Sequence, residues 1–543
     1  MKGSVRRERS FDTAESETLG MCGSSMRENR EALQTPTLDG GVGRSKKAKS
    51  RNVDMHVCGE SDGLVVPAKR ANKADGYGLA AESAEGRRVT KGNAPQARSC
   101  RTQSRGCESQ GLWRVRQAAR RDRRIRFSAL FHHITPQLLR ASYWELNHQA
   151  VPGIDGETWR EYGKHLVARI EDLHERVQRE TYRAKPSKRA WIAKAGGQRP
   201  LGMAALEDKI VQQAVVTVLT PIYETDFLGF SYGFRPGRNQ HQALDALWMG
   251  FHWRRVNWVL DADIKAFFDT VDHDWVLRLL EHRIADRRIL RLIRKWLTAG
   301  VVEDGKKREV KVGTPQGAVI SPLLANIYLH YVFDLWIQRW RRRDAKGDVI
   351  VVRYADDSVA GFESKADVGR FLTALKERFA KFGLSLNEEK TRVLEFGRFA
   401  AQHCRQRGAR RPQTFDFLGF THICSTTRTN GRFTVLRLTS SKRMRSTVKV
   451  LRQILHRRRH EPVRKIGPWL RRVVQGYFNY HAVPGNSRRL NNFRRDVARA
   501  WRHALLRRGQ RARLPWARFA QYVARYLPQV RVAHPYPNQR FAF

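Results

Sequence analysis

The most constraining feature of the sequence is an apolar stretch, residues 349–362, that two adjacent aspartates interrupt. The residues on either side of the pair read as two β-strands, and Asp356 and Asp357 fall in the tight turn that joins them. Two neighbouring carboxylates repel each other. Such a turn is therefore stable mainly when a divalent cation or a basic partner neutralises the two charges.

A second stretch contributes another carboxylate. Residues 258–264 alternate as a strand does, with Asp261 and Asp263 on one face and apolar side chains on the other. Asp263, Asp356 and Asp357 can therefore converge from two strands. A cluster of hard oxygen ligands suits Mg²⁺, and two such ions ~3.5–4 Å apart can activate an attacking hydroxyl and stabilise a leaving pyrophosphate.

The tetrapeptide Tyr354-Ala355-Asp356-Asp357 resembles the signature of reverse transcriptases. Alone, such a match would be better interpreted as an exposed acidic hairpin, but further blocks occur in the family's order and spacing. They are residues 263–269, 313–328, 386–391 and 415–420. From about Gly92 to its C-terminus, the chain resembles the group II intron reverse transcriptases and maturases.

The resemblance implies an α+β fold of the right-hand polymerase type, in which fingers and palm precede an all-helical thumb, or maturase domain. The predicted boundaries are 1–110 for a basic extension, 111–255 for N-terminal helices and fingers, 256–430 for the palm, and 431–543 for the thumb with a basic C-terminal segment. The composition of the extension cannot bury enough apolar surface to order it, so we interpret it as disordered or wrongly included.

The same resemblance implies the metal site. Asp263, Asp356 and Asp357, with Ile264 beside them, would hold two Mg²⁺ ions, and Mn²⁺ could replace Mg²⁺. Asp261 and Asp269 match no metal position of the family, so we expect them to be hydrogen-bonding or surface acids.

Binding of the incoming dNTP is implied for five side chains: Lys194, Arg199, Phe268, Gln316 and Lys390. Lys194 and Arg199, on a predicted hairpin at 191–201, would reach the triphosphate. Gln316 would lie near the nucleotide and template. Lys390 would donate a proton to pyrophosphate, although an exposed lysine is the competing interpretation.

Phe268 would select the sugar. Its ring would collide with a 2′-hydroxyl, which favours deoxynucleotides. Phe267 is then expected in the core, because successive residues on a strand face opposite sides.

The charge of the chain predicts a polyanionic partner. Lys and Arg total 103 against 52 acidic residues, a formal charge of +51. A compact protein with this excess repels itself unless a polyanion shares its surface, so nucleic acid is favoured over a solvated basic face. The expected contacts lie in the fingers and on the thumb helices, at Arg235, Arg238, Arg445, Lys449, Arg494, Arg495, Arg499 and Arg502.

The predicted function is RNA-directed DNA synthesis for a group II intron, with binding of the intron RNA to assist splicing and mobility. The expected partners are group II intron RNA, a DNA target and primer, and dNTPs. No apolar run approaches ~20 residues, so we expect no membrane and a cytoplasmic location. We also expect no metal endonuclease after Leu514. Two alternatives stay open: an RNA-binding splicing factor with little polymerase activity, and a reverse transcriptase serving a retron, a diversity-generating element or a CRISPR array.

Overall fold

A computed structural model of the 543-residue chain divides into two units, Met1–Gly59 and Glu60–Phe543. The structure describes residues 110–540 apart from 195–196, 310–311, 315–316, 428 and 510–512. The side chains at 193, 194, 197 and 199 are also outside the description. The predicted basic extension therefore lies outside the described residues, except for Gln110.

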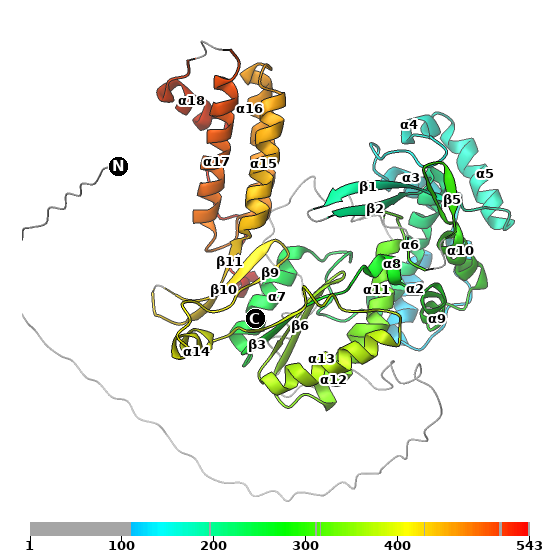
Figure 1. The fold of residues 1–543 in the computed structure, drawn as a ribbon. Coiled ribbons are helices and arrows are strands. Elements are labelled where there is room, and N and C mark those ends of the chain that lie inside the picture. Colours follow the sequence, from blue (N-terminus) through cyan, green and yellow to red (C-terminus); the bar gives the residue numbers. More distant parts are fainter. Residues whose placement is uncertain are drawn as a thin grey trace, which may run out of the picture. The chain divides into compact units, whose positions relative to one another are not determined.

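The first described part of the chain is helical and packs around a long buried helix, α6 (Leu206–Asp226) (Figure 1). The preceding elements are α2 (Gln110–Arg121), η1 (Phe131–His133), α3 (Pro136–Glu145), α4 (Trp159–Tyr162), η2 (Gly163–His165) and α5 (Leu166–Gln178). Helices α2 and α3 both contact α6. The buried apolar side chains of this region belong to one core, which also includes Leu260 and Val351 of the central sheet described below.

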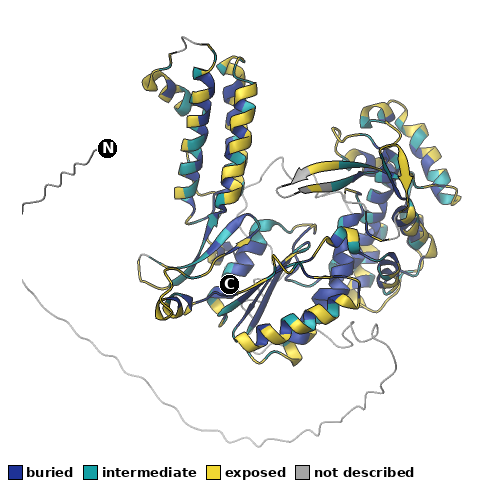
Figure 2. Ribbon diagram, viewed as in Figure 1, coloured by how far each residue is buried: buried dark blue, intermediate teal, exposed yellow. Residues whose placement is uncertain are grey.

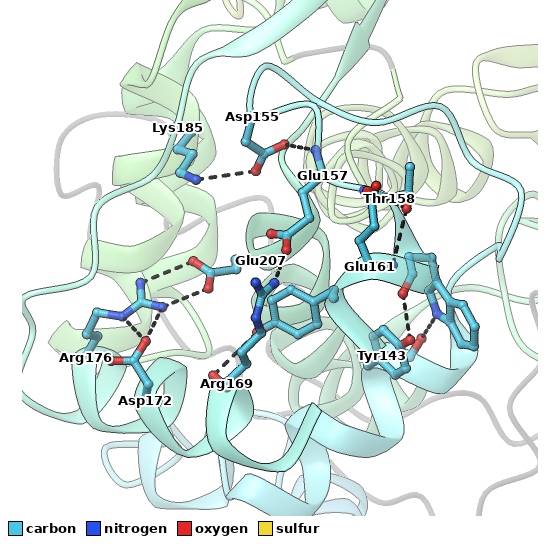
Figure 3. A network of polar contacts seen from close by, with 12 residues as sticks. Tyr143, Asp155, Glu157, Thr158, Glu161, Arg169, Asp172, Arg176, Lys185 and Glu207 are labelled. Atoms are coloured by element: carbon cyan, nitrogen blue, oxygen red, sulfur yellow. Dashed lines mark hydrogen bonds and ion pairs between the residues drawn. The ribbon is translucent and has the colours of Figure 1, made fainter. Parts of the chain in front are cut away.

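A polar network ties the surface of this helical region together (Figure 3). Arg176 on α5 pairs at 2.8 Å with both Asp172, one helical turn away, and Glu207 on α6. Lys185, in the segment that leads to the first strand, pairs with Asp155 at 3.4 Å. These contacts join α5 to α6, and they join the segment before the hairpin to the loop that precedes α4.

The first sheet has the strand order β2-β1-β4-β5. Its strands are β1 (Ser187–Lys194), β2 (Gly197–Met203), β4 (Val301–Glu303) and β5 (Lys306–Arg308). Strands β1 and β2 form an antiparallel hairpin, and β1 pairs with β4 in parallel. The predicted hairpin at 191–201 is confirmed.

The central sheet consists of β3 (Trp258–Asp263), β6 (Val349–Tyr354), β7 (Asp357–Phe362) and β8 (Arg392–Glu395), in the order β6-β7-β3-β8. All of its neighbouring strands are antiparallel. Leu260 and Val351 lie on one face, in the large core shared with α11 and α13, whereas Val259 and Val352 lie on the other, beneath α7. Both faces are buried, which explains the run of four apolar residues, 349–352, in β6. Both predicted strands and their hairpin are confirmed.

The chain forms further helices before, between and after the strands of the central sheet. They are α7 (Gln240–Trp253), α8 (Phe267–Thr270), α9 (His273–Glu281), α10 (Arg287–Thr298), α11 (Ser321–Leu329), α12 (Leu335–Arg343), α13 (Lys365–Ala380) and α14 (Ala400–Gln406). Helix α11 continues into α12 through a π-helical turn, η3 (His330–Asp334). Phe267 and Phe268 lie in α8, so the prediction that they belong to a strand is wrong.

The last part of the chain begins with a small sheet, ordered β11-β10-β9, of β9 (Phe415–Phe417), β10 (Phe420–Thr426) and β11 (Phe433–Thr439). We call α15 (Ser441–Arg457), α16 (Val463–His481) and α17 (Ser487–Leu506) the C-terminal helices. Short helices α18 (Trp516–Tyr526) and α19 (Pro537–Arg540) follow. Because β11 lies within 431–543, this region is not all-helical as predicted, and its helices begin at Ser441.

The C-terminal helices bury one stripe each and expose the rest, as Figure 2 shows. Met444, Val448, Leu451 and Leu455 form the buried stripe of α15. This is the stripe expected from apolar residues at helical spacing. Within the described residues, no helix is both long enough and apolar enough to cross a membrane.

Candidate active site

The turn between β6 and β7, which carries the paired aspartates, contains one residue in a strained conformation. Tyr354 and Asp357 are the last paired residues of the hairpin, which leaves Ala355 and Asp356 at its tip. Ala355 has φ +57°, in the left-handed region that costs a non-glycine residue roughly 1–2 kcal/mol. Strain of this kind persists only where surrounding contacts hold the backbone in place.

Strand pairing brings the third aspartate to this turn. Strands β3 and β7 are antiparallel in a register that sets Asp263 directly opposite Asp357. Residues opposite each other in such a pair have Cβ atoms roughly 4.5–5.5 Å apart. The structure therefore sets two of the three predicted carboxylates, those of Asp263 and Asp357, on directly opposite positions of neighbouring strands.

The clustered carboxylates disfavour one another's charge. The pKa of Asp357 is raised to about 6, first because its carboxylate is withdrawn from water and then because of the negative charges of Asp356, Asp263 and Asp261. The positive charge of Arg443, on α15, opposes this rise. A divalent cation bound among these oxygens would remove the repulsion, so the donor set fits a hard metal ion.

Lys390 lies at the same site. Its Nζ donates to Asp263 Oδ2 at 2.8 Å, and its segment runs beside the end of β3, where Asn387 N donates to Asp263 O at 2.8 Å. Among the described residues, no three His, Cys, Asp or Glu side chains form a group that could hold a metal. Asp263 is paired with Lys390 in this conformation, so a metal ion bound there would have to displace the ammonium.

The other acid of β3 has a basic partner. Asp261 pairs with Arg392 on β8 at 3.3 Å, and burial raises the pKa of its carboxyl group. Asp269 is exposed. The expectation that these two acids are hydrogen-bonding or surface residues fits both positions.

Phe267 lies in the core and Phe268 is more exposed, as predicted, but the physical reason is different. Phe267 is 2% exposed, and Phe268 is half-buried at the edge of the same core. Phe267 and Phe268 are successive residues of a helical turn, α8, which follows Ala266 at φ +46°, and their ring centres lie 5.4 Å apart in an edge-to-face contact. The backbone of Phe268 is fixed by Thr314 N, which donates to its carbonyl oxygen at 2.7 Å.

Three predicted nucleotide-binding side chains lie outside the described residues. Gln316 is one. Lys194 and Arg199 are the others, although their backbones belong to β1 and β2, where Arg199 pairs with Ile192. Their contacts with a dNTP remain predictions.

The structure corrects the role predicted for Arg235. This residue is 3% exposed and pairs with Glu224 at 3.0 Å. It also donates to the carbonyl oxygens of Leu228 and Ser231, at 2.8 and 2.6 Å. Its donors bind protein acceptors, so Arg235 is a structural residue rather than a template contact.

Arg238 is similarly engaged by its own loop. It donates to the carbonyl oxygen of Gly229, and its guanidinium lies 4.9 Å from the centre of the Tyr232 ring. The side chain is half-buried. A contact with nucleic acid remains a prediction for this residue.

The basic residues predicted on the C-terminal helices fall into two groups. Arg445, Lys449, Arg495 and Arg499 are exposed on α15 and α17. Arg494 instead donates to the carbonyl oxygens of Pro528 and Leu527, at 3.0 and 3.3 Å. Arg502 donates to Leu514 O at 3.0 Å and lies 4.1 Å from the centre of the Trp516 ring. Arg494 and Arg502 thus hold the chain that follows α17, and contacts of these two residues with nucleic acid remain predictions.

Arg353 is the residue that reasoning from the sequence missed. It directly follows four apolar residues, 349–352, of a strand that is buried on both faces, and it is 1% exposed. A charged residue within such a run was the available signal, because a buried charge requires a partner.

Comparison with known proteins agrees with this geometry. Residues 184–422 match the family described as "Reverse transcriptase (RNA-dependent DNA polymerase)". Protein YkfC of Escherichia coli is 34% identical over 277 residues, which cover 45% of this chain and 72% of YkfC. Group II intron-encoded protein LtrA of Lactococcus lactis is 40% identical over 164 residues, which cover 30% of this chain and 27% of LtrA. Nuclear intron maturase 2 of Arabidopsis thaliana is 32% identical over 109 residues, which cover 19% of this chain and 15% of that protein.

The fold and the paired aspartates define the class as a polymerase of the reverse transcriptase type. Within that class, the chain belongs to the family of group II intron reverse transcriptases and maturases. Reverse transcriptases in general use divalent metal ions. The matched segment covers about a quarter of LtrA and a smaller share of the Arabidopsis maturase.

Proposed function

We propose that this protein is an RNA-directed DNA polymerase that extends a primer 3′-hydroxyl with dNTPs on an RNA template. The observation that carries the proposal is the register of the central sheet, which sets Asp263 opposite Asp357 beside a strained turn. A hairpin with two solvated acids would not need a third carboxylate from another strand beside its turn, because the added negative charge is unfavourable without a cation. The family to which the chain belongs supports the same activity.

We further propose that the site holds two Mg²⁺ ions through Asp263, Asp356 and Asp357 and the backbone carbonyl of Ile264. Bound ions would supply a lowered pKa for the primer hydroxyl and a counter-charge for the leaving pyrophosphate. Lys390 would leave Asp263 and donate to the departing phosphate, and the ion pair between its ammonium and Asp263 supports this role. The ring of Phe268 would exclude a 2′-hydroxyl.

Intron RNA, a DNA target and a primer are the proposed partners. The exposed cations of α15 and α17 support this proposal, because arginines and lysines along a helix bind phosphates without reading sequence. Binding of this kind would hold the folded intron RNA and thereby assist splicing. We assign 111–255 to the fingers, 256–430 to the palm and Ser441 onward to the thumb, and a cytoplasmic location is part of the same proposal.

Primer extension and intron excision test the two halves of this proposal. The full chain is incubated with an RNA template, an annealed DNA primer, dNTPs and Mg²⁺, and separately with the precursor of a group II intron found beside its reading frame. We expect extension on RNA and faster excision. Excision without extension would replace the polymerase proposal with an RNA-binding splicing factor. Extension without excision would favour a retron, a diversity-generating or a CRISPR system.

A further inference from the structure

A buried cation lies directly beneath the aspartate turn. Arg353 lies near the end of strand β6, and its guanidinium makes five hydrogen bonds to protein acceptors. Two reach the carboxylate of Asp334, at 2.7 and 2.5 Å, and one reaches the carbonyl oxygen of Ala355 at 2.8 Å. The remaining two reach Asn326 Oδ1 at 3.1 Å and Ser231 Oγ at 2.8 Å. The residue bound through its backbone is therefore the strained one that precedes Asp356 and Asp357.

The anchor of this cation lies in an irregular helical turn. Asp334 is fully buried and is the last residue of η3, the π-helical turn between α11 and α12. A single π-turn inside a longer helix changes the direction of the side chains that follow it, and such turns occur frequently at functional sites. Here the turn ends at the carboxylate that accepts hydrogen bonds from two guanidinium nitrogens of Arg353.

The loop at 230–233 holds the turn from a second side. Arg353 exchanges backbone hydrogen bonds with this loop, donating to Phe230 O and accepting from Tyr232 N, both at 2.9 Å. Gly233 lies so close that a Cβ atom there would be 2.9 Å from Ala355 Cα. Asn326 on α11 joins both sides, because its Nδ2 donates to Gly233 O at 2.7 Å.

A net gain in stability is a weak explanation for this arrangement. Desolvating two charges costs about as much as their attraction returns, so a well-packed apolar pair of similar volume is often as stable as a buried ion pair or more so. The remainder of β6 is apolar and would accept such a pair. What an apolar pair could not do is bind the carbonyl oxygen of Ala355.

We propose that Arg353 and Asp334 are positioning residues, which hold the Ala355 carbonyl so that Asp356 and Asp357 face Asp263 across the central sheet. This inference rests on the proposed function, because it assigns a role to the turn in metal binding. Asp334 acts only through Arg353, and Arg353 acts only through the backbone of the turn.

The first test compares two conservative variants, Asp334→Asn and Arg353→Lys, with the parent. Binding of Mn²⁺ to the protein with a primer–template duplex is followed by the loss of the free-ion EPR signal, and primer extension is measured over a range of Mg²⁺ concentrations. We expect each variant to need about 10- to 100-fold more metal, as when the hydrogen-bonding partners of metal ligands are removed. RNA affinity should be unchanged.

A second buried ion pair provides the matched control. Arg283 and Asp226 pair at 2.9 Å with side chains 3% and 9% exposed, and they join the segment between α9 and α10 to the end of α6 rather than to the turn. Asp226→Asn and Arg283→Lys should lower the melting temperature as the first two variants do, without changing the metal dependence. If all four variants changed metal dependence only in proportion to their loss of melting temperature, the positioning role would be overturned.

The double variant Arg353→Met with Asp334→Leu separates folding from positioning. We expect it to fold, because it leaves no unpaired buried charge, and to lose Mn²⁺ binding together with extension. If this variant bound Mn²⁺ as the parent does, the inference would be overturned. It would also be overturned if every variant of Arg353 and Asp334 unfolded while the control variants of Asp226 and Arg283 stayed folded. A parent that binds Mn²⁺ but extends no primer would instead refute the polymerase proposal, and the inference would be judged on Mn²⁺ binding.

Discussion

Charged side chains have fixed neighbours in the central sheet, whereas many of those on the C-terminal helices extend into solvent. Asp263 is held by Lys390 and Asp261 by Arg392, while Arg445 and Lys449 stand on the exposed face of α15. Chemistry at a metal requires charges at defined positions, whereas affinity for a polyanion requires only their density. Variants of the sheet should therefore remove reaction and leave binding, and variants of the helices should do the reverse.

The same contrast recurs within a single helix. Arg494 and Arg495 are neighbours on α17, yet Arg494 binds the carbonyl oxygens of Pro528 and Leu527, whereas Arg495 is exposed and bonds locally, to Asn492 at 2.8 Å. A basic residue on these helices is therefore not automatically a nucleic-acid contact.

The largest expected effect is that of Asp356→Asn. The substitution keeps the size of the side chain and removes one charge of the metal site, so primer extension should fall at least about 10³-fold, since metal ions supply several kcal/mol to such reactions. RNA affinity and intron excision should persist, because neither needs chemistry from the protein. Extension, filter binding and excision are measured on one preparation. Loss of excision by a folded, RNA-bound variant would refute the maturase half of the proposal.

Phe268→Ala should produce the next largest change. Without the ring, the site should accept ribonucleotides about 10- to 100-fold better relative to deoxynucleotides, a range typical of shape selection by one side chain. Competing incorporation of the two nucleotide types in primer extension measures this ratio. Phe267→Ala is the matched control: it should cost about 3–5 kcal/mol of stability, because Phe267 is buried, and leave the ratio unchanged in folded protein. Equal ratios for Phe268→Ala and the parent would exclude Phe268 as the selecting residue.

A quadruple variant tests the C-terminal helices. Replacement of Arg445, Lys449, Arg495 and Arg499 by Gln should weaken RNA binding about tenfold or more near 0.2 M salt. The slope of the logarithm of the binding constant against the logarithm of the salt concentration, the salt slope, should fall by up to about 0.9 for each phosphate that the variant no longer binds. Short primer extension at low salt should remain. Arg494→Gln with Arg502→Gln should instead lower the melting temperature and leave the slope unchanged. The division into two groups fails if both variants flatten the slope equally.

The smallest expected effect concerns pH. Because the pKa of Asp357 rises from 3.8 to about 6 on folding, its contribution to stability is present below pH 4 and is lost as the pH rises through 6. Asp357→Asn should therefore melt about 1–2 °C above the metal-free parent at pH 7.5 and equally at pH 4, a small difference because the residue is partly open to solvent. Added Mg²⁺ should stabilise the parent but not the variant. Thermal melts at the two pH values measure the difference, and a destabilised variant at pH 7.5 would contradict the charge repulsion.

Local patterns determined much of this protein. The apolar runs around Asp356 and Asp357 form the predicted hairpin, and Val448, Leu451 and Leu455 face the core of the C-terminal helices. These features follow from periodicities of about two and 3.6 residues, which depend only on neighbours in the chain. The family blocks indicated the fold class for the same reason, because each is a contiguous stretch of sequence.

Only the tertiary structure decided which charged residues have partners. Arg353 binds Asp334 across 19 residues, and Asp263 binds Lys390 across 127. Arg235 also reads in the sequence as a free cation, and it is buried because Glu224 and two carbonyl oxygens converge on it. A sequence specifies which side chains carry charge, but the cost of burying each charge depends on acceptors that distant segments deliver, and those segments meet only when the chain has folded.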